Sequence, residues 1–482
     1  AFNAAFRIPN FLQNLFGEGV LSASFIPVYA RLRANGDDEA AAHVAGAVAA
    51  LLAVATSLLV LVGVLVTPWL IWLIAPGFVG AKRELTITLV RILFPGAGLL
   101  VLSAWCLGVL NSHRRFLLSY SAPIVWNVAI IAALLWRGPH VGEFDLAVVG
   151  AWASVVGSAL QLLVQLPMVF TLLDHFRPSL ETASEHVRTV ITNFGPVFVG
   201  RGVVQISGYI DSAIASLLGM GALAALTNAQ ALYMLPVSLF GMSVSAAELP
   251  AMSSATGGTA EVAEYLRSRL DAGLRRIAFL VVPSAMAFLA LGDVLAAALF
   301  QSGRFTHADS VYVWSILAGS AVGLLASTLG RLYSSTYYAL RDTKTPLRYA
   351  VVRVLLTGTL GFLFAIPLPR LLGIDVRWGA GGLTASAGIS AWVEFTLLRR
   401  TLNARIGRTG LRASLVSRLW LAALLAAAAA WGVRILVGPV PSIVLAVATL
   451  IPYGAVYFAV AAALGVPEVR GVLGRVMRRS RP

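Results

Sequence analysis

The chain of 482 residues is 59% hydrophobic and only 12% charged, with a mean hydropathy of +0.84. These values exclude an ordinary soluble domain, which is about half apolar and a quarter charged, and they indicate a polytopic membrane protein. The net charge of +15 does not predict a nucleic-acid partner, because membrane proteins concentrate basic residues in loops beside anionic lipid headgroups. The single cysteine, Cys106, excludes a disulfide within the chain.

Thirteen apolar runs are long enough to cross the bilayer, which takes about 20 residues of helix. They are rich in Leu, Ala and Val and are separated by short polar loops, which is typical of an α-helical bundle and not of a membrane β-barrel. Because Ala1 already lies within an apolar pattern, we expect one helix to precede it in the full-length protein. In chain order the runs are 2–30, 44–66, 85–110, 118–136, 146–172, 190–218, 222–250, 273–299, 310–338, 346–366, 379–398, 415–437 and 441–465.

Basic residues are distributed unequally between alternate loops. The C-terminal tail and the loops after the odd-numbered runs from the first to the eleventh hold 24 of the 36 Lys and Arg residues. Lys and Arg accumulate in cytoplasmic loops, so we expect the C-terminal tail in the cytoplasm and Ala1 on the opposite side. The intervening loops hold only six basic residues: Lys82, Arg83, Arg137, Arg304, Arg370 and Arg377.

The first run carries a stripe of polar residues, Asn3, Arg7, Asn10, Asn14 and Glu18. On a helix, neighbouring members of this stripe lie within about 60° of one another. A charge at the bilayer centre costs at least about 2.5–3.5 kcal/mol, so such groups normally face a water-filled cavity or a partner. The stripe therefore predicts a polar cavity along one face of this helix.

Two further charges, Arg201 and Asp211, lie in the run 190–218. On one helix they are about 15 Å apart along the axis and about 80° apart around it, so they cannot pair with each other. Asp211 lies too deep to reach the interface, and we expect it to bind a cation or to partner a cavity arginine. Charges nearer the ends of their runs are expected to snorkel to the membrane surface; these are Arg91, Arg353, Arg434 and Glu394.

Motifs of soluble enzymes are not found in the sequence: it holds no P-loop, no HExxH, no CxxC and no metal-ligand spacing of its six histidines. We therefore expect neither an enzyme nor a bound cofactor. A secondary transporter or flippase is the usual function of such a bundle.

Four segments carry a resemblance to a known family. They are FRIPNFLQNLFGEGVLSASFIPVYA, LFPGAGLLVLSAWCLGVLNSHRRF, LFQSGRFTHADS and YALRDTKTPLR, and together they resemble the MurJ (MviN) family of lipid II flippases, in the MOP superfamily with the MATE exporters. The similarity covers nearly the whole chain. It implies an all-α, two-lobed MOP/MATE-like bundle of fourteen transmembrane helices, thirteen of them expected here. The implied parts are an N-lobe (1–172), a C-lobe (190–400), a groove for the lipid tail (415–465) and a basic cytoplasmic tail (466–482).

The resemblance also implies a function, which is alternating access that moves lipid II across the bacterial cytoplasmic membrane for cell-wall synthesis. A Na⁺ gradient or the membrane potential would drive it, and cell-wall synthesis proteins would be partners. Arginines suit the diphosphate of lipid II through charge-assisted, bidentate hydrogen bonds. Asp211 matches the place of an acidic sodium ligand. The implied substrate cavity residues are Arg7, Asn10, Asn14 and Glu18, with Arg201 as a further cation.

The sequence departs from the family pattern at three places. Gln13 and Ala231 stand where the family has arginine, and Met234 stands where an acidic residue often follows. Two alternatives therefore remain open: a flippase for another polyprenyl-diphosphate-linked glycan, and a MurJ-like scaffold protein of cell-wall synthesis that does not transport. A drug exporter of the MATE kind would need an acidic cavity, and the arginine-bearing stripe argues against it.

Overall fold

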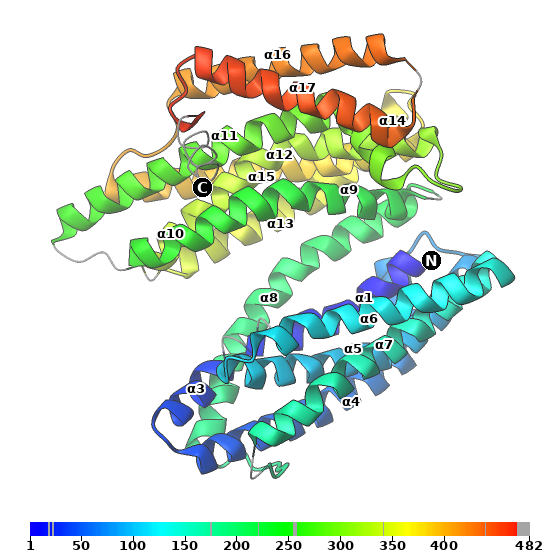
Figure 1. The fold of residues 1–482 in the computed structure, drawn as a ribbon, viewed down its shortest axis with the longest axis vertical. Coiled ribbons are helices and arrows are strands. Elements are labelled where there is room, and N and C mark those ends of the chain that lie inside the picture. The colour runs from blue at the N-terminus through cyan, green and yellow to red at the C-terminus, as the bar shows by residue number, and fades with distance from the viewer. Residues whose placement is uncertain are drawn as a thin grey trace, which may run out of the picture. The chain divides into compact units, whose positions relative to one another are not determined.

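A computed structural model describes residues 1–17, 20–21, 24–173, 176–219, 221–253, 258–340, 342–438 and 440–469. Over these ranges the chain forms helices and no strands, as expected where the hydrocarbon core forces backbone groups to hydrogen-bond within one segment. The chain divides into two compact units, unit 1 (Ala1–Leu217) and unit 2 (Leu218–Pro482), which are drawn from blue to green and from green to red in Figure 1.

Unit 1 is built around α5, which contacts α1, α4, α6 and α7. One apolar core lies around Phe25, Tyr29 and Leu110, and a second one lies around Ile8 and Phe94. The α-helices of unit 1 are α1 (Phe2–Phe16), α3 (Ile26–Ala34), α4 (Asp38–Ile74), α5 (Gly80–Ser112), α6 (Phe116–Arg137), α7 (Glu143–Leu172) and α8 (Glu185–Leu217).

The first apolar run is not one continuous helix. The run 2–30 is interrupted because α1 ends at Phe16, Gly17 is extended (φ −81°, ψ −158°) and α3 begins only at Ile26. A Cβ atom on residue 17 would collide with the backbone oxygen of Gln13, so the chain can take this path only with glycine.

Unit 2 contains the remaining helices, with α12 and α15 packed closely along their length. Glycine permits this approach, since a Cβ atom on Gly319 would collide with the backbone of Gly381, and one on Gly323 with that of Gly388. The α-helices of unit 2 are α9 (Ala222–Pro236), α10 (Ser243–Ser253), α11 (Thr259–Phe300), α12 (His307–Ala339), α13 (Lys344–Ala365), α14 (Pro367–Leu371), α15 (Gly379–Ile406), α16 (Ala413–Val437) and α17 (Ser442–Ala463), and the short helices η2 (Val237–Met242) and η3 (Val376–Trp378) complete the unit.

The longest helix of unit 2, α11, is kinked, and indole groups satisfy backbone carbonyls beside the kink. Leu291 has non-helical dihedral angles (φ −131°, ψ 15°). Trp314 Nε1 donates to the carbonyl oxygen of Leu289 (3.0 Å), and Trp431 Nε1 donates to that of Ala290 (2.9 Å). Carbonyls that a kink frees within a membrane need such replacement donors.

The last two helices, α16 and α17, pack against α11 through further polar contacts (Figure 1). Pro283 has no N–H to offer the carbonyl of Phe279, one turn earlier in α11, and Tyr457 OH of α17 donates to that oxygen instead (2.6 Å). Arg434 of α16 forms an ion pair with Asp293 of α11 (2.7 Å). These contacts fix the pair α16–α17 on unit 2.

Ten helical stretches among the described residues are long and apolar enough to cross a membrane. The prediction of an all-helical, multi-pass membrane protein is confirmed, whereas the number thirteen stays a prediction, because α1, α3, α8 and α15 are not among the ten. The predicted parts of the chain also stay predictions. The structure differs from them at α8, which the sequence division placed in the C-lobe (190–400) and which here contacts α1, α3 and α4 within unit 1.

Candidate functional site

Arg7 of α1 is held against α8 by hydrogen bonds. Its Nη1 donates to the carbonyl oxygen of Gly208 (3.1 Å) and to Ser212 Oγ. In the other direction, Tyr209 OH donates to the backbone oxygen of Arg7 (2.9 Å), and the Tyr209 ring meets the Phe11 ring edge to face at 5.3 Å. Neutral acceptors on α8 and an aromatic contact therefore fix this charged side chain within unit 1.

Asp211 lies on the same part of α8 and attracts Arg7 electrostatically. Its Oδ1 atom is buried. Opposite charges that share a poorly hydrated position reduce the cost that each would carry alone. Of the two roles expected for Asp211, this arrangement favours the partner of an arginine, and the role of sodium ligand stays a prediction.

The rest of the polar stripe does not gather at Arg7. Asn10 instead lines a cavity of about 10 Å³ facing α5, α6 and α7, together with Trp126 and Ser158. Asn14 is exposed. Glu18 lies outside the described residues, as does the side chain of Arg201, whose backbone belongs to α8. Among the described site residues, the structure therefore brings together Arg7 and Asp211.

Unit 2 contains ion pairs that the sequence analysis did not anticipate. Arg353 of α13 pairs with Glu394 of α15 (3.1 Å), and Arg434 pairs with Asp293 (2.7 Å). The expectation that Arg353, Arg434 and Glu394 snorkel to the surface is wrong, because each has a partner on a neighbouring helix. Snorkelling remains the interpretation of Arg91, which is exposed on α5.

Arg331 of α12 is a functional candidate that the sequence analysis assigned no role. Its side chain is exposed and lies within electrostatic range of Tyr233, Arg353 and Glu394. Among the described residues it forms no hydrogen bond or ion pair. Tyr233 OH and Ser327 Oγ are 2.8 Å apart and join α9 to α12 one turn before Arg331. An exposed guanidinium beside a second arginine can attract an anionic ligand.

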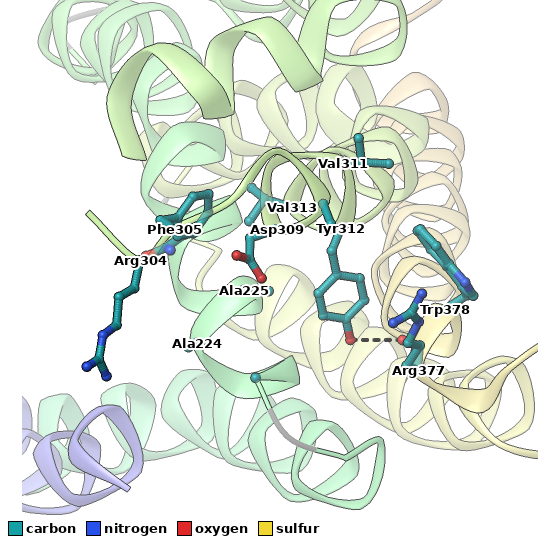
Figure 2. Close-up of a pocket in the computed structure, with 13 residues that line it drawn as sticks. Ala224, Ala225, Arg304, Phe305, Asp309, Val311, Tyr312, Val313, Arg377 and Trp378 are labelled. Carbon is teal, nitrogen blue, oxygen red and sulfur yellow. Dashed lines mark hydrogen bonds between the residues drawn. The ribbon is translucent and has the colours of Figure 1, made fainter. Parts of the chain in front are cut away.

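A pocket of about 700 Å³ opens at one end of unit 2 (Figure 2). The starts of α9 and α12 and the residues around η3 line it, with Arg304, Asp309, Tyr312, Arg377 and Trp378 as its larger polar and aromatic members. Tyr312 OH donates to the backbone oxygen of Arg377 (2.8 Å), as the dashed line in Figure 2 marks. The sequence analysis placed both arginines in loops but could not bring them together.

A polar cluster occupies the start of the loop after α5, next to α3. Arg33 Nη1 can only donate, so Nδ1 of His113 accepts from it (2.8 Å) and Nε2–H then donates to Tyr29 OH (2.8 Å). Arg33 also pairs with Asp38 (3.4 Å). Burial, followed by the charge of Arg33, lowers the pKa of His113 below its ordinary 6.5. His113 is therefore neutral near pH 7.

The motif RDTKTP forms the turn before α13. Asp342 accepts hydrogen bonds from Thr345 Oγ1 (2.7 Å) and Thr345 N (3.0 Å), and it pairs with Arg405 of α15 (2.7 Å). These hydrogen bonds, with that from the Thr345 hydroxyl foremost, lower the pKa of Asp342 to about 2. The motif therefore has a local structural role, since it starts α13 and ties it to α15.

Residues 1–447 match the sequence profile of the family described as lipid II flippase MurJ. The chain belongs to this MurJ family. It is 33% identical over 411 residues to the lipid II flippase MurJ of Burkholderia cenocepacia, which covers 84% of this chain and 77% of that protein. It is 29% identical over 412 residues to the probable lipid II flippase MurJ of Vibrio cholerae, with 83% and 76% covered.

Solved structures show the same fold. A lipid II flippase MurJ in an inward closed conformation matches with a TM-score of 0.77 and 20% identity, over 96% of this chain and 91% of that one. An inward-facing MATE multidrug transporter of the MOP superfamily matches with a TM-score of 0.70 and 18% identity, over 84% and 90%. The predicted MurJ resemblance and MOP fold are thus confirmed, and the family consists of transporters.

Two positions of this MurJ family member deserve comparison with the resemblance. At Gln13, on α1, the side chain is half-buried, and at Ala231, on α9, it is exposed. Ala231 lies close in sequence to Tyr233, the residue that neighbours Arg331. Although the arginine expected on α9 is missing, α12 therefore supplies a guanidinium next to the same helix.

Proposed function

We propose that this MurJ family member moves lipid II, the lipid-linked peptidoglycan precursor, across the bacterial cytoplasmic membrane by alternating access. The observation that carries the proposal is the profile match over residues 1–447, which spans helices of both units. The shared fold with MurJ and MATE transporters supports transport as the activity, without an enzymatic step. The distribution of basic residues supports a cytoplasmic C-terminal tail.

Binding of the headgroup diphosphate is the chemical task that arginine suits best. Guanidinium groups offer paired donors to phosphate oxygens, and their charge-assisted bonds are about twice as strong as neutral ones. We assign this task to Arg7 in unit 1 and Arg331 in unit 2. Asn10, Asn14, Glu18 and Arg201 complete the proposed cavity residues, each by its place in the sequence pattern.

The contact between Arg7 and Asp211 suggests how a cation enters the cycle. In this structure Asp211 attracts Arg7. A diphosphate that binds Arg7 would compete with Asp211 for the guanidinium, and the carboxylate would then be available to Na⁺. Either a Na⁺ gradient or the membrane potential can supply the energy in this scheme, and proteins of cell-wall synthesis are the proposed partners.

Two measurements test the proposal. The full-length gene should restore growth to cells depleted of their own lipid II flippase, and vesicles containing the purified protein should expose fluorescent lipid II to an outer-leaflet reagent. Failure of both at normal protein level would contradict the proposal. Transfer of a different polyprenyl-diphosphate glycan would identify the alternative cargo, and restored growth without any transfer would favour the scaffold alternative.

A further inference from the structure

The 700 Å³ pocket of unit 2 has the size of a ligand site, because small-molecule pockets in proteins range from about 300 to 1,000 Å³. Three chain segments frame it: the start of α9, the turn before α12 with the first turns of that helix, and the segment around η3. All three follow loops of the class that holds few basic residues. By the distribution of charge, the pocket therefore opens on the side away from the cytoplasm.

The arginines of the pocket are unusual for that side of the membrane. The loops of this class hold six basic residues in total, and two of the six, Arg304 and Arg377, line this one pocket. Basic residues in exported loops oppose the positive-inside bias, so their presence needs a separate reason. Figure 2 shows Arg304 on one side of the pocket and Arg377 with Trp378 on the other.

The turn that presents Arg304 belongs to the segment FQSGRF, which the proposed transport function leaves unexplained. Gly303 has φ +58°, a left-handed conformation that residues with a side chain rarely adopt. The rings of Phe300 and Phe305 lie 6.0 Å apart and close the turn. The segment thus places Arg304 at the pocket by a defined turn.

The opposite wall is held in place by aromatic contacts. Tyr312 meets Trp378 edge to face at 5.8 Å and donates its hydroxyl to the Arg377 backbone (2.8 Å). The Arg377 guanidinium lies over the Trp378 ring at 5.3 Å. An aromatic surface beside an arginine can pack against the apolar part of a ligand while the arginine binds its charge.

The acidic residues beside the pocket are engaged with backbone groups. Asp309 accepts from both the N–H and the hydroxyl of Thr306 (each 2.7 Å) at the start of α12. Asp375 accepts from Arg377 N (3.0 Å) and pairs with Arg377 Nε at 3.4 Å, where both side chains are more than half exposed. An ion pair this exposed is weak and easily exchanged for a better acceptor. A carboxylate ligand can therefore compete for Arg377.

We propose that this pocket binds a carboxylate-bearing peptide, the peptide part of the transported headgroup, on the side where the substrate leaves. The proposal rests on the proposed function for the identity of the ligand. Arg304 and Arg377 would bind the peptide carboxylates through charge-assisted hydrogen bonds, and Tyr312 and Trp378 would pack against its apolar side chains. The pocket thus gives the headgroup a second contact after it has left the phosphate-binding arginines.

A cysteine-protection experiment on the full chain tests this. Cys106 is buried, so a cysteine introduced at the exposed pocket residue Ala224 should be the main site of labelling by a maleimide in detergent micelles. A soluble disaccharide–pentapeptide lacking the lipid should slow the labelling of A224C. The same compound with amidated carboxylates, and the disaccharide without peptide, should not slow it.

Arginine variants then locate the effect. Arg377→Ala and Arg304→Ala should each weaken protection by about tenfold, since a hydrogen bond to a charged group contributes about 1.5–3 kcal/mol. Arg377→Lys should retain part of the effect. The matched control is Arg370→Ala, which removes one charge from the same loop at a residue outside the pocket and should leave protection unchanged. Unchanged elution from a sizing column verifies the fold of each variant.

The outcomes separate this proposal from the proposed function. Wild-type protein that transfers lipid II while A224C is never protected would refute the pocket and leave transport intact. Protection without lipid II transfer would support the pocket as a peptide site and contradict the proposed function. Protection by the disaccharide alone would overturn the peptide as ligand in favour of the sugar. Protection by lipid II but not by the soluble peptide compound would also overturn it, by making the lipid the required part.

Discussion

Arg7 in unit 1 and Arg331 in unit 2 lie in long apolar runs, yet their surroundings differ. Arg7 donates to Gly208 O and Ser212 Oγ and lies beside Asp211. Arg331 is exposed, has Arg353 as a like-charged neighbour and forms no hydrogen bond or ion pair within the described part of the chain. The same side chain therefore has a structural use in unit 1, in addition to its proposed substrate contact, and is open to a ligand in unit 2.

The largest expected effect in this comparison is that of Arg7→Ala. It removes the contacts to α8 and leaves Asp211 without the guanidinium that it attracts. Loss of one member of a buried charged pair costs about 3–5 kcal/mol. We expect the free energy of unfolding in detergent to fall by that order, together with loss of growth complementation. Arg91→Ala, which changes an exposed arginine of α5, is the control and should stay within about 0.5 kcal/mol of wild type.

A double variant sharpens this test. If Arg7 and Asp211 stabilise each other, Arg7→Ala with Asp211→Asn should be less destabilised than the sum of the two single variants, by about 0.5–3 kcal/mol. Strict additivity would mean that the two charges do not interact. Asp211 would then return to the role of an independent cation ligand, and sodium-dependent stability of the wild type would be the next measurement.

Arg331→Ala should show the opposite behaviour. Because Arg331 is exposed beside Arg353, its removal should change the unfolding free energy by no more than about 0.5 kcal/mol. Transfer of lipid II in vesicles should nevertheless fall about tenfold, the equivalent of one lost charge-assisted hydrogen bond. Arg331→Lys should lie between the two. A large loss of stability without a specific loss of transport would remove the distinction between the two arginines.

The smallest expected effect is a pH dependence from His113 of unit 1. Burial and Arg33 lower its pKa below 6.5, so the unfolded chain binds the proton more readily than the folded one. This contribution to stability is complete above about pH 6.5 and is lost as the pH falls from there through the folded pKa. Unfolding measured between pH 7.5 and 5 should show a slope that His113→Gln reduces. An unchanged slope in this variant would contradict the neutral tautomer inferred from the Arg33 contact.

Much of the fold could be read from hydropathy. The runs 310–338 and 415–437 correspond to α12 (His307–Ala339) and α16 (Ala413–Val437) within three residues at either end. Agreement is close because a segment in hydrocarbon must satisfy its own backbone groups, and only a helix does so alone. Prediction failed at Gly17, where a steric contact with the Gln13 backbone ends α1. Hydropathy contains no information about such a contact.

The candidate sites divide in the same way. The sequence alone determined the membrane class, the helices, the unequal loops and the charges that need a partner, because these follow from local composition and from the energy of transfer into hydrocarbon. Only the tertiary structure decided the partners: Arg7 with α8, Arg353 with Glu394, and Arg304 with Arg377 across one pocket. Those pairings depend on which helices pack together and how each is rotated about its axis. Contacts among residues far apart in the chain determine both.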